Sequence, residues 1–365
     1  MKCMRCNNKN RLLFEKLFCP NCTQCYYCLK CAHISIFKLC DSLKEDLIFT
    51  YENVTLKLQY HLTNNQKIIS DKIIKNIINS NIFINATCGA GKTEIVFKVI
   101  KNYINNHKHV CFVTPRIEVT KELYLRFNKV FNTTFGIITG EEKIHTGAMF
   151  FMTCNQLINY HDTFDLVIVD EADAFPLAND KILESGIKKS LRTNGKIIKM
   201  SATPLKIEKD YITLSLFERY HKQIIPTPVF QKTSMNYLKN ITKKDKWIIF
   251  FPTIKTLQET YNLLNNPDII ICHSRITNIS EKLSALHDSY IIFSTAILER
   301  GITLSNINVL VYNSHHENFK ANTLIQISGR VGRVFPHTNG NIIFMADYKT
   351  RAIINSIKYV GSLND

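Results

Sequence analysis

Short apolar runs of strand length alternate along the chain with stretches that carry apolar residues at helical spacing. In the first half such runs occupy residues 82–85, 166–169 and 196–200, and the first is followed by apolar positions 95, 96, 99 and 100, spaced as on one face of a helix. After Pro226 and Pro228 the pattern restarts, with strand-like runs at 247–251, 269–272, 290–294, 308–312 and 342–345. Strands that alternate with helices form parallel sheets. The pattern therefore predicts an α/β fold with two tandem parallel-sheet domains.

The length also indicates more than one domain. A chain of 365 residues with 45% hydrophobic and 21% charged residues is globular, and it is long enough for two domains and a small appendage. We expect a cysteine-rich zinc-binding module over residues 1–45, a first sheet domain over 46–225 and a second over 226–365.

The apolar runs are far shorter than the roughly 20 residues that a membrane helix needs. No signal-peptide pattern opens the chain, so we expect a protein that stays in the cytosol. The net charge of +16 favours a polyanionic partner, and nucleic acid is the leading candidate.

Cysteines are concentrated at the N-terminus. Eight of the 12 lie in the first forty residues, namely Cys3, Cys6, Cys19, Cys22, Cys25, Cys28, Cys31 and Cys40. Disulfides are rare in a reducing cytosol, whereas paired C-x-x-C turns direct two thiolates at one tetrahedral zinc ion. Because about forty residues bury little surface, bound zinc should contribute much of this module's folding energy.

The ligand pairing is open from spacing alone. Cys3 and Cys6 form a ribbon-like set with either Cys19 and Cys22 or Cys28 and Cys31, and two zinc ions are possible. Three cysteines outside the cluster stand in apolar, strand-like contexts, where cysteine behaves as a small buried hydrophobe. They are Cys111, Cys154 and Cys272.

Residues 86–93 read A-T-C-G-A-G-K-T between a predicted strand and a predicted helix. This order is the context in which such a motif binds nucleotide phosphates. Glycines let backbone N–H groups approach the phosphates, Lys92 would reach the β- and γ-phosphates, and Thr93 would bind Mg²⁺. The sequence therefore predicts an ATP site formed by Gly89, Ala90, Gly91, Lys92, Thr93 and Glu94.

A second acidic motif, D-E-A-D at residues 170–173, follows the strand-like run at 166–169. Asp170 would hold Mg²⁺ and Glu171 would polarise the attacking water. An acidic helix N-cap is the alternative, and the phosphate loop upstream favours the catalytic interpretation. Ser201, Ala202 and Thr203 follow another strand, and they either couple the nucleotide site to a neighbouring domain or form a simple turn.

The second sheet domain carries no phosphate loop but has the run Q-I-S-G-R-V-G-R at residues 326–333. Gln326, Arg330 and Arg333 are predicted catalytic residues, with the arginines acting as fingers on a γ-phosphate. Such a finger can be worth roughly 10³ to 10⁵ in rate. The alternative is a solvated basic turn, or two arginines that touch a nucleic-acid backbone.

Taken together these motifs resemble a superfamily 2 helicase core with two RecA-like domains. Within it the chain resembles the ComFA family, late-competence proteins that act as DNA-uptake ATPases in naturally transformable Gram-positive bacteria. The superfamily series comprises the phosphate loop, T-P-R at 114–116, T-G at 139–140, D-E-A-D at 170–173, S-A-T at 201–203, residues 294–303 and residues 326–333. The closest matches to the ComFA family are C-G-A-G-K-T-E at 88–94, T-P-R at 114–116, D-E-A-D-A-F-P at 170–176 and I-L-E-R-G-I-T at 297–303. The resemblance extends over nearly the whole chain.

The resemblance implies a motor with an ATPase activity that single-stranded DNA stimulates, at the cytoplasmic side of the membrane DNA-uptake channel. ATP, Mg²⁺ and Zn²⁺ are the implied cofactors, and a small phosphoribosyltransferase-like competence protein is an implied partner. Gln66 would contact adenine. A tyrosine before a C-x-x-C pair falls at Tyr27, which favours zinc at Cys3, Cys6, Cys28 and Cys31. Cys19, Cys22 and Cys25 would serve a second zinc site, with Cys40 as a further candidate.

Nucleic-acid contacts are also implied by the resemblance. They would come from the first sheet domain at Arg116, Thr139, Gly140, Thr153 and Gln156, and from the second at Thr253, His273 and Thr295. Contacts of this kind read the backbone and carry no sequence information.

Rival interpretations remain. A replication-restart or repair helicase also combines this motor with zinc, but its cysteines lie within the helicase region and not ahead of it. An RNA helicase is a further alternative. From another class, a zinc-bearing nucleic-acid-binding protein could use ATP only as a switch. ATP turnover with and without single-stranded DNA, compared with RNA, distinguishes these interpretations.

Overall fold

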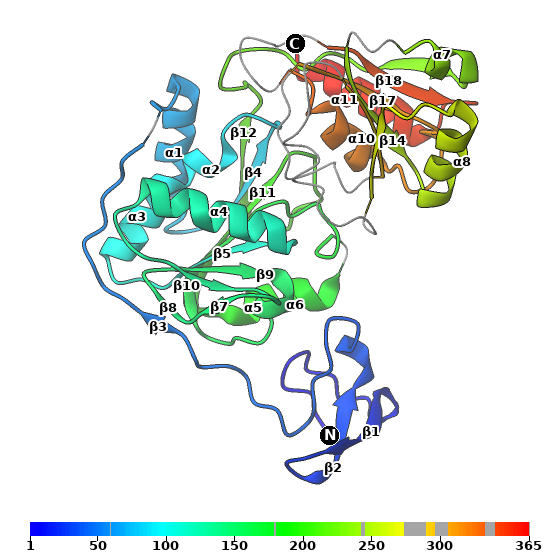
Figure 1. The fold of residues 1–365 in the computed structure, drawn as a ribbon. Helices are drawn as coiled ribbons and strands as arrows, with labels where there is room; N and C mark the ends of the chain where they lie inside the picture. The colour runs from blue at the N-terminus through cyan, green and yellow to red at the C-terminus, as the bar shows by residue number, and fades with distance from the viewer. Residues whose placement is uncertain are drawn as a thin grey trace. The chain divides into compact units, whose positions relative to one another are not determined.

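The computed structural model describes residues 1–58, 60–178, 180–241, 245–273, 290–295, 306–332 and 340–364. They form two compact units (Figure 1), the first made of Met1–Asn85 and Lys92–Leu216, the second of Ala86–Gly91 and Phe217–Asp365. The predicted limits of the zinc module and the two domains stay predictions. In the described part of the chain, no helix is both long and apolar enough to cross a membrane.

The first unit begins with the cysteine-rich module. A 3₁₀ turn, η1 (Arg11–Leu13), leads into an antiparallel hairpin of β1 (Phe14–Cys19) and β2 (Thr23–Cys28), and a second 3₁₀ turn, η2 (Leu29–Cys31), follows. Its small core consists of Phe14 and Phe37 together with three of the cysteines. A two-stranded hairpin with so little apolar burial is only marginally stable by itself.

The main sheet of the first unit is parallel across its centre, from β4 to β6, and β7 is antiparallel to β6. The order across the sheet is β12 (Tyr211–Leu216), β4 (Asn81–Ala86), β11 (Leu191–Ser201), β10 (Phe164–Val169), β5 (Val110–Thr114), β9 (Phe150–Thr153), β6 (Gly136–Ile138) and β7 (Lys143–Ile144). A separate short pair joins β3 (Ile48–Phe49) to β8 (Thr146–Gly147).

Helices cover both faces of this sheet because neighbouring strand residues point to opposite sides. On one face Phe112 of β5 packs against Phe127 of α4. On the other, Cys111 belongs to a core cluster with Leu157 of α5 and Leu183 of α6. The helices of the unit are α1 (Asn64–Asn76), α2 (Lys92–Ile95), α3 (Phe97–Asn105), α4 (Ile117–Val130), α5 (Cys154–Leu157) and α6 (Lys181–Ser190).

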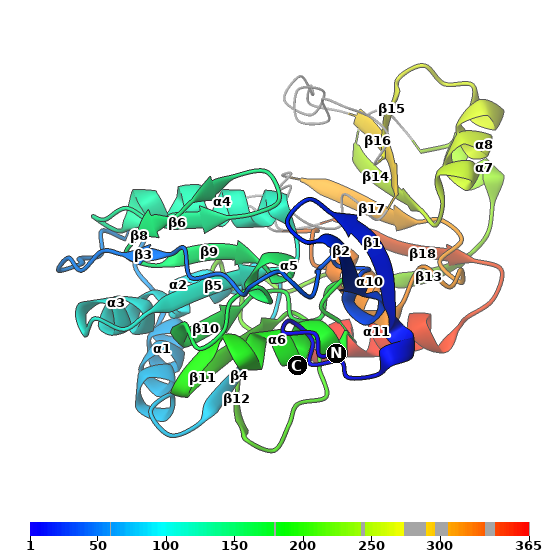
Figure 2. The same ribbon diagram turned by 90° about the horizontal axis from the view of Figure 1, so that it is seen from below.

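The second unit contains a fully parallel sheet (Figure 2). Its order is β13 (Val229–Lys232), β18 (Ile342–Ala346), β17 (Ile307–Val311), β14 (Lys246–Phe251), β16 (Tyr290–Thr295) and β15 (Ile269–Cys272). Helices α7 (Met235–Lys239) and α8 (Ile254–Leu264) pack on one face, where Ile249 points, and α10 (Ala321–Ser328) and α11 (Arg351–Ser362) on the other, with Phe250.

The predicted fold class is confirmed: each unit contains a parallel sheet flanked by helices. Every strand expected from the apolar runs lies within an observed strand or overlaps one, and the helical pattern at 95–100 falls in α2 and α3. Cys111, Cys154 and Cys272 are fully buried, as their apolar contexts predict.

Candidate functional site

The predicted phosphate loop connects β4 to α2. Gly89 and Gly91 have φ angles of +84° and +78°, in the left-handed region that residues with a Cβ disfavour. Loops that pass through this region present successive N–H groups to an anion. Ala90 and Thr93 are buried, and Lys92 and Thr93 open α2. The residues present therefore fit the triphosphate of ATP.

Asp170 directly follows β10 and is only 7% exposed. Burial raises the pKa of this carboxyl to about 6, and the positive charge of Lys92 opposes the rise. Lys92 is thus close enough to act on the Asp170 charge. The next residue, Glu171, has a φ of +50°, and its N–H donates to Oδ1 of Asp170 over 2.8 Å. Such a backbone costs a non-glycine residue about 1–3 kcal/mol and is concentrated at functional sites.

The acidic motif is joined to the segment that ends β11. The Thr203 hydroxyl donates to Oδ2 of Asp173 over 2.8 Å, and the Ser201 hydroxyl donates to the Thr203 carbonyl over 2.7 Å. All three side chains are buried. Residues 201–203 are therefore more than a turn into Pro204, since their side chains connect two strand ends of the first sheet.

Gln66 and Glu94, both predicted to contact the nucleotide, form contacts with other residues of the protein. Gln66 closes a capping box at the start of α1: the Thr63 N–H donates to Gln66 Oε1 over 2.9 Å, and the Gln66 N–H donates to Thr63 Oγ1 over 3.2 Å. Glu94 forms an ion pair with Arg126 of α4, a residue that the motifs did not indicate. Contact of Gln66 with adenine stays a prediction.

Gln326 lies in α10 of the second unit, and Arg330 follows that helix. Both side chains are buried, at 6% and 4% exposure. A fully solvated basic turn therefore does not describe Arg330. Arg333 lies outside the described residues, as does the I-L-E-R-G-I-T motif at 297–303.

Arg219 is a residue of the second unit that sequence reasoning missed. The residue is 4% exposed, and its guanidinium donates to four backbone carbonyls. The acceptors are Cys88 in the phosphate loop at 3.1 Å, Gly329 at 2.9 Å, Val331 at 2.8 Å and Gly332 at 2.9 Å. One side chain thus ties the phosphate loop to the loop that contains Arg330. Acceptors of this kind are main-chain atoms, so no residue pattern could have indicated them.

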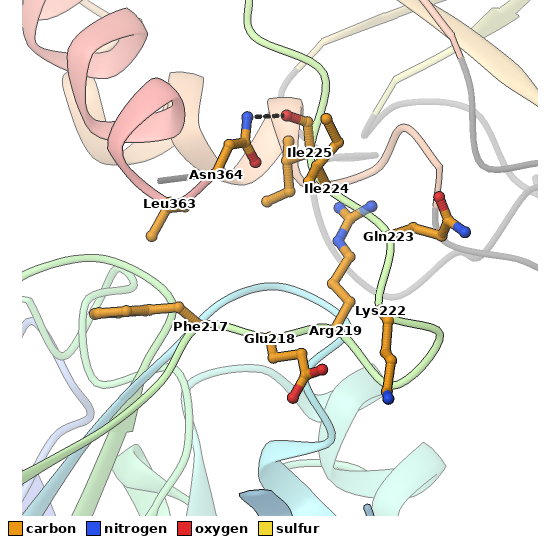
Figure 3. Close-up of a pocket in the computed structure, with 9 residues that line it drawn as sticks. All are labelled: Phe217, Glu218, Arg219, Lys222, Gln223, Ile224, Ile225, Leu363 and Asn364. Carbon is orange, nitrogen blue, oxygen red and sulfur yellow. Dashed lines mark hydrogen bonds between the residues drawn. The ribbon is translucent and has the colours of Figure 1, made fainter.

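Figure 3 shows the segment that carries Arg219, together with the pocket that it helps to line. Thr87 of the phosphate loop donates to the Phe217 carbonyl over 2.9 Å, and the Tyr220 N–H donates to the Gly89 carbonyl over 3.3 Å. Near the C-terminus the Asn364 amide donates to the Ile225 carbonyl over 2.9 Å. The segment is therefore fixed on both sides of Arg219.

The predicted nucleic-acid contacts of the first unit are gathered at one edge of its sheet. Arg116 caps α4 after β5, Thr139 and Gly140 follow β6, Thr153 ends β9, and Gln156 lies in α5. Because β10, β5, β9 and β6 are parallel neighbours, their carboxyl ends share this edge with the acidic motif.

Thr139 and Gly140 differ in what they can offer a ligand. Thr139 is fully buried, and its hydroxyl oxygen accepts from the N–H groups of Glu141 and Glu142 over 3.2 and 2.9 Å. Gly140 is exposed. Thr139 therefore shapes the turn, and Gly140 is the position that a backbone could reach.

A similar edge exists in the second unit. Thr253 follows β14, His273 follows β15 and Thr295 ends β16, and these strands are parallel neighbours. The Thr253 hydroxyl oxygen accepts from the Thr256 N–H over 3.0 Å as the N-cap of α8. His273 is 9% exposed, so little of its surface is accessible.

In the N-terminal module the sulfur atoms of Cys3, Cys6, Cys28 and Cys31 lie within 4.8 Å of one another. The Cys3–Cys31 and Cys6–Cys28 sulfur separations are 3.8 and 3.5 Å. Four thiolates at about 2.3 Å from a tetrahedral zinc ion are about 3.8 Å apart. The residues present fit zinc, in the pairing that the resemblance favoured and not the alternative with Cys19 and Cys22.

The remaining cysteines of the module also come together. The sulfur atoms of Cys19, Cys22 and Cys40 lie within 4.8 Å of one another, and Cys25 Sγ is 3.4 Å from Cys40 Sγ. Cys40, which the resemblance left as a further candidate, lies close to both Cys19 and Cys25 in this second group.

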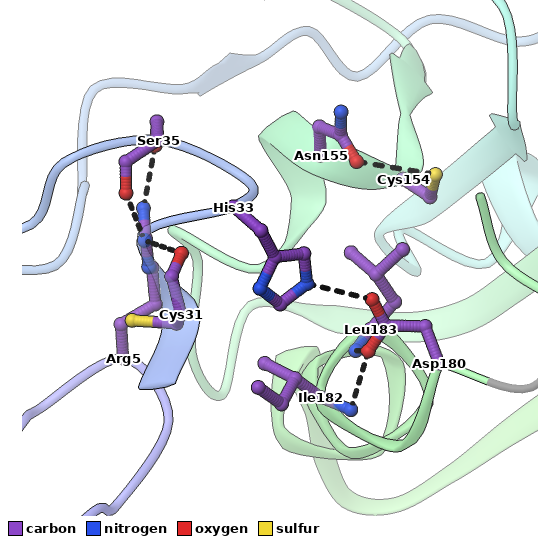
Figure 4. A network of polar contacts seen from close by, with 9 residues as sticks. All are labelled: Arg5, Cys31, His33, Ser35, Cys154, Asn155, Asp180, Ile182 and Leu183. Carbon is purple, nitrogen blue, oxygen red and sulfur yellow. Dashed lines mark hydrogen bonds and ion pairs between the residues drawn. The ribbon is translucent and has the colours of Figure 1, made fainter. Parts of the chain in front are cut away.

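Two polar contacts join the module to α6 of the same unit, and Figure 4 shows the surroundings of the first. His33 Nε2 lies 2.9 Å from Oδ2 of Asp180. Oδ1 of Asp180 accepts from the first N–H groups of α6, and Lys189 Nζ donates to the Arg5 carbonyl over 3.2 Å. Arg5 is buried and donates to the carbonyls of Cys31 and Ser35. These contacts join residues far apart in the chain, and no local signal indicated them.

Comparison with protein families locates two helicase segments. Residues 59–206 match the family described as type III restriction enzyme, res subunit, and residues 231–335 match the helicase conserved C-terminal domain. Among solved structures, yeast Dbp5 bound to RNA and ADP BeF3 has a TM-score of 0.59 at 17% identity, covering 83% of this chain and 92% of that chain. The Mycobacterium smegmatis helicase Lhr has a TM-score of 0.58 at 13% identity, covering 82% of this chain and 48% of that chain. Both show the fold, two RecA-like helicase domains.

Curated relatives of known name match nearly end to end. The competence protein ComFA of Streptococcus pneumoniae is 31% identical, with 99% of this chain and 90% of that protein covered. ComFA of Bacillus subtilis is 26% identical, with 100% and 86% covered. With its helicase domains and phosphate loop, the chain is an ATPase. At this identity and coverage, it belongs to the ComFA family.

Proposed function

We propose that this protein is an ATP-driven motor that moves along single-stranded DNA and drives the import of transforming DNA in natural competence. The relatives carry the name competence protein. The observation that carries the motor proposal is the common edge of the first sheet, where the acidic motif and the predicted backbone contacts follow neighbouring parallel strands. Ligands of open α/β sheets bind at such carboxyl edges.

Hydrolysis requires charge neutralisation and a positioned water. Lys92 would neutralise the β- and γ-phosphates, and Thr93 and Asp170 would hold Mg²⁺, which supplies electrostatic stabilisation of the transferred phosphoryl group. Glu171 would orient the attacking water. Arg330 and Arg333 would stabilise charge on the γ-phosphate, and Gln326 is the third catalytic residue proposed from this motif.

We also propose that Cys3, Cys6, Cys28 and Cys31 bind a structural zinc ion. Four thiolates fill a tetrahedral coordination sphere and leave no position for substrate. Zinc would replace the apolar core that the module lacks, since the cysteines themselves make up much of its buried residues. Removal of the metal should therefore loosen the module and leave the sheet domains folded.

The proposed setting is the cytoplasmic side of the membrane. A peripheral position at the DNA-uptake channel and a phosphoribosyltransferase-like partner belong to the same proposal, and both follow from the family. The strongly basic composition, with a net charge of +16, supports a polyanionic ligand.

The test is ATP turnover with no nucleic acid, with single-stranded DNA, with duplex DNA and with single-stranded RNA. We expect a large stimulation by single-stranded DNA and loss of turnover in Lys92→Ala. Equal stimulation by RNA would favour an RNA helicase, and turnover unaffected by any nucleic acid would favour a switch protein. Turnover that persisted in Lys92→Ala would contradict the assigned ATP site.

A further inference from the structure

We propose that Cys19, Cys22, Cys25 and Cys40 form a second zinc site, separate from the one at Cys3, Cys6, Cys28 and Cys31. The four residues come from the end of β1, the hairpin turn, the body of β2 and the segment that leaves the module. Only a soft, four-coordinate cation suits four clustered thiolates, and zinc is the usual one.

The sulfur atoms of the second cluster are separated by distances that suit zinc. Cys40 Sγ lies 3.6 Å from Cys19 Sγ and 3.4 Å from Cys25 Sγ, and Cys22 Sγ is within 4.8 Å of both Cys19 and Cys40. Tetrahedral zinc places thiolates about 3.8 Å apart, whereas a disulfide needs about 2.05 Å. The two shortest separations in the first cluster are similar, 3.8 and 3.5 Å. There all four sulfur atoms lie within 4.8 Å of one another, whereas in the second cluster Cys19, Cys22 and Cys40 do so and Cys25 is tied to the group through Cys40.

The two sites lie at opposite ends of one hairpin. Cys28 pairs with Phe14 at the first end of the β1–β2 register, and Cys19 pairs with Thr23 at the other. Five strand steps of about 3.4 Å separate these ends by about 17 Å, so each cluster must hold its own ion. A second ion would fix the turn end, which the small core around Phe14 and Phe37 does not reach.

Cys40 gives the second ion a further structural role. The chain returns to the hairpin just before it, with Lys38 bridged to Tyr27 and the Leu39 N–H donating to the Tyr26 carbonyl over 2.8 Å. Zinc at Cys40 would anchor the point where the module ends and the connection to the first sheet begins.

The test is the zinc content of the purified, reduced full-length protein by elemental mass spectrometry. We expect about two ions per chain in the wild type and about one in Cys40→Ser, in Cys22→Ser and in Cys6→Ser. Cys88→Ser, a cysteine outside both clusters, should retain both ions. One ion in the wild type that is unchanged in Cys40→Ser would overturn the proposal. So would a Cys25–Cys40 or Cys19–Cys40 disulfide in non-reduced peptide maps.

Titration of the zinc-free wild type with Co²⁺ keeps the proposal testable if a variant fails to fold. The absorption of tetrahedral thiolate-bound Co²⁺ should rise until about two equivalents are added. Saturation at one equivalent would contradict the second site. ATP turnover tests the motor separately from the metal content. The second zinc site can therefore be present if the proposed motor function is wrong, and absent if that function is right.

Discussion

Arg219 donates a hydrogen bond from Nε to the backbone carbonyl of Cys88 over 3.1 Å. Its two terminal nitrogens donate to the backbone carbonyls of Gly329, Val331 and Gly332. The planar fork of a guanidinium suits this arrangement, and the point charge of a lysine does not. Because the side chain is almost fully buried, these carbonyls have little access to water that could replace it.

We therefore expect Arg219→Lys to lower ATP turnover at least tenfold, a change of about 1.4 kcal/mol in the activation barrier. The lysine can reach only part of the acceptor set, so the phosphate loop and the Gly329–Gly332 segment lose their common restraint. Steady-state kinetics would measure the loss. Lys222→Asn, an exposed position in the same segment, is the control and should have little effect. Wild-type turnover in Arg219→Lys would show that the restraint is dispensable.

Arg330→Ala should leave ATP affinity within a few-fold of wild type and reduce hydrolysis by roughly 10³ or more, if the arginine acts on charge that develops at the γ-phosphate. Fluorescent-nucleotide binding and single-turnover hydrolysis measure the two quantities separately. Since Arg330 is buried, thermal unfolding of Arg330→Ala and Arg330→Lys is needed to show that the fold persists. A large loss of affinity in a folded variant would argue for a binding role instead.

Binding of single-stranded DNA should weaken with salt, with a slope of about −0.7 in log affinity against log salt for each neutralised phosphate. Arg116→Ala should make this slope less steep by about 0.7 and weaken binding to all sequences alike. Lys129→Ala is a matched control, because it removes an exposed charge at the other end of α4. An unchanged slope in Arg116→Ala would remove this residue from the proposed contacts.

From the environment of His109 we expect the free energy of unfolding to depend on pH. Its Nδ1 lies 3.0 Å from the Thr163 carbonyl and its Nε2 2.9 Å from the Tyr51 hydroxyl, while the ring stacks on Phe49 at 3.5 Å. Nδ1 must carry the proton, because a carbonyl can only accept. Burial lowers the pKa of His109, and the positive charge of Arg192 adds to this effect.

A lowered histidine pKa means that the unfolded chain binds the proton more readily than the folded one. Stability is therefore fully present above the unfolded value of about 6.5 and is lost as pH falls through that value toward the lower folded pKa. Urea unfolding at pH 8 and pH 5 should show this loss, and His109→Gln should reduce it. His161→Gln, at an exposed position, is the control. An equal pH dependence in wild type and His109→Gln would exclude His109 as the source.

Local pattern predicted most of the architecture but not the contacts that hold it together. The apolar runs located β4, β10 and β11 in the first sheet and β14 to β18 in the second, because strands buried on both faces are continuously hydrophobic. β6 has three residues and β13 is half polar, so neither shows an apolar run of strand length. The phosphate loop around Gly89 and Gly91 was predictable because glycines between a strand and a helix let backbone N–H groups approach an anion.

The sequence could not predict the contacts between residues that are far apart in the chain. Arg219 bonds to main-chain carbonyls, which are the same in every residue, and the contact of His33 with Asp180 joins distant segments. Cys40 lies nine residues after Cys31, outside any C-x-x-C pair, so spacing gave it no fixed partner. The return of Lys38 and Leu39 to β2 brings it to Cys19 and Cys25.

The close approach of the phosphate loop to residue 329 has an evolutionary consequence. A Cβ at Gly329 would lie 2.6 Å from the Cβ of Cys88 and 2.7 Å from its sulfur, closer than real Cβ contacts allow. A lineage that gains a side chain at 329 must therefore lose one at 88 or shift the backbone. Positions 88 and 329 should vary together among homologous sequences, with glycine retained at one of them.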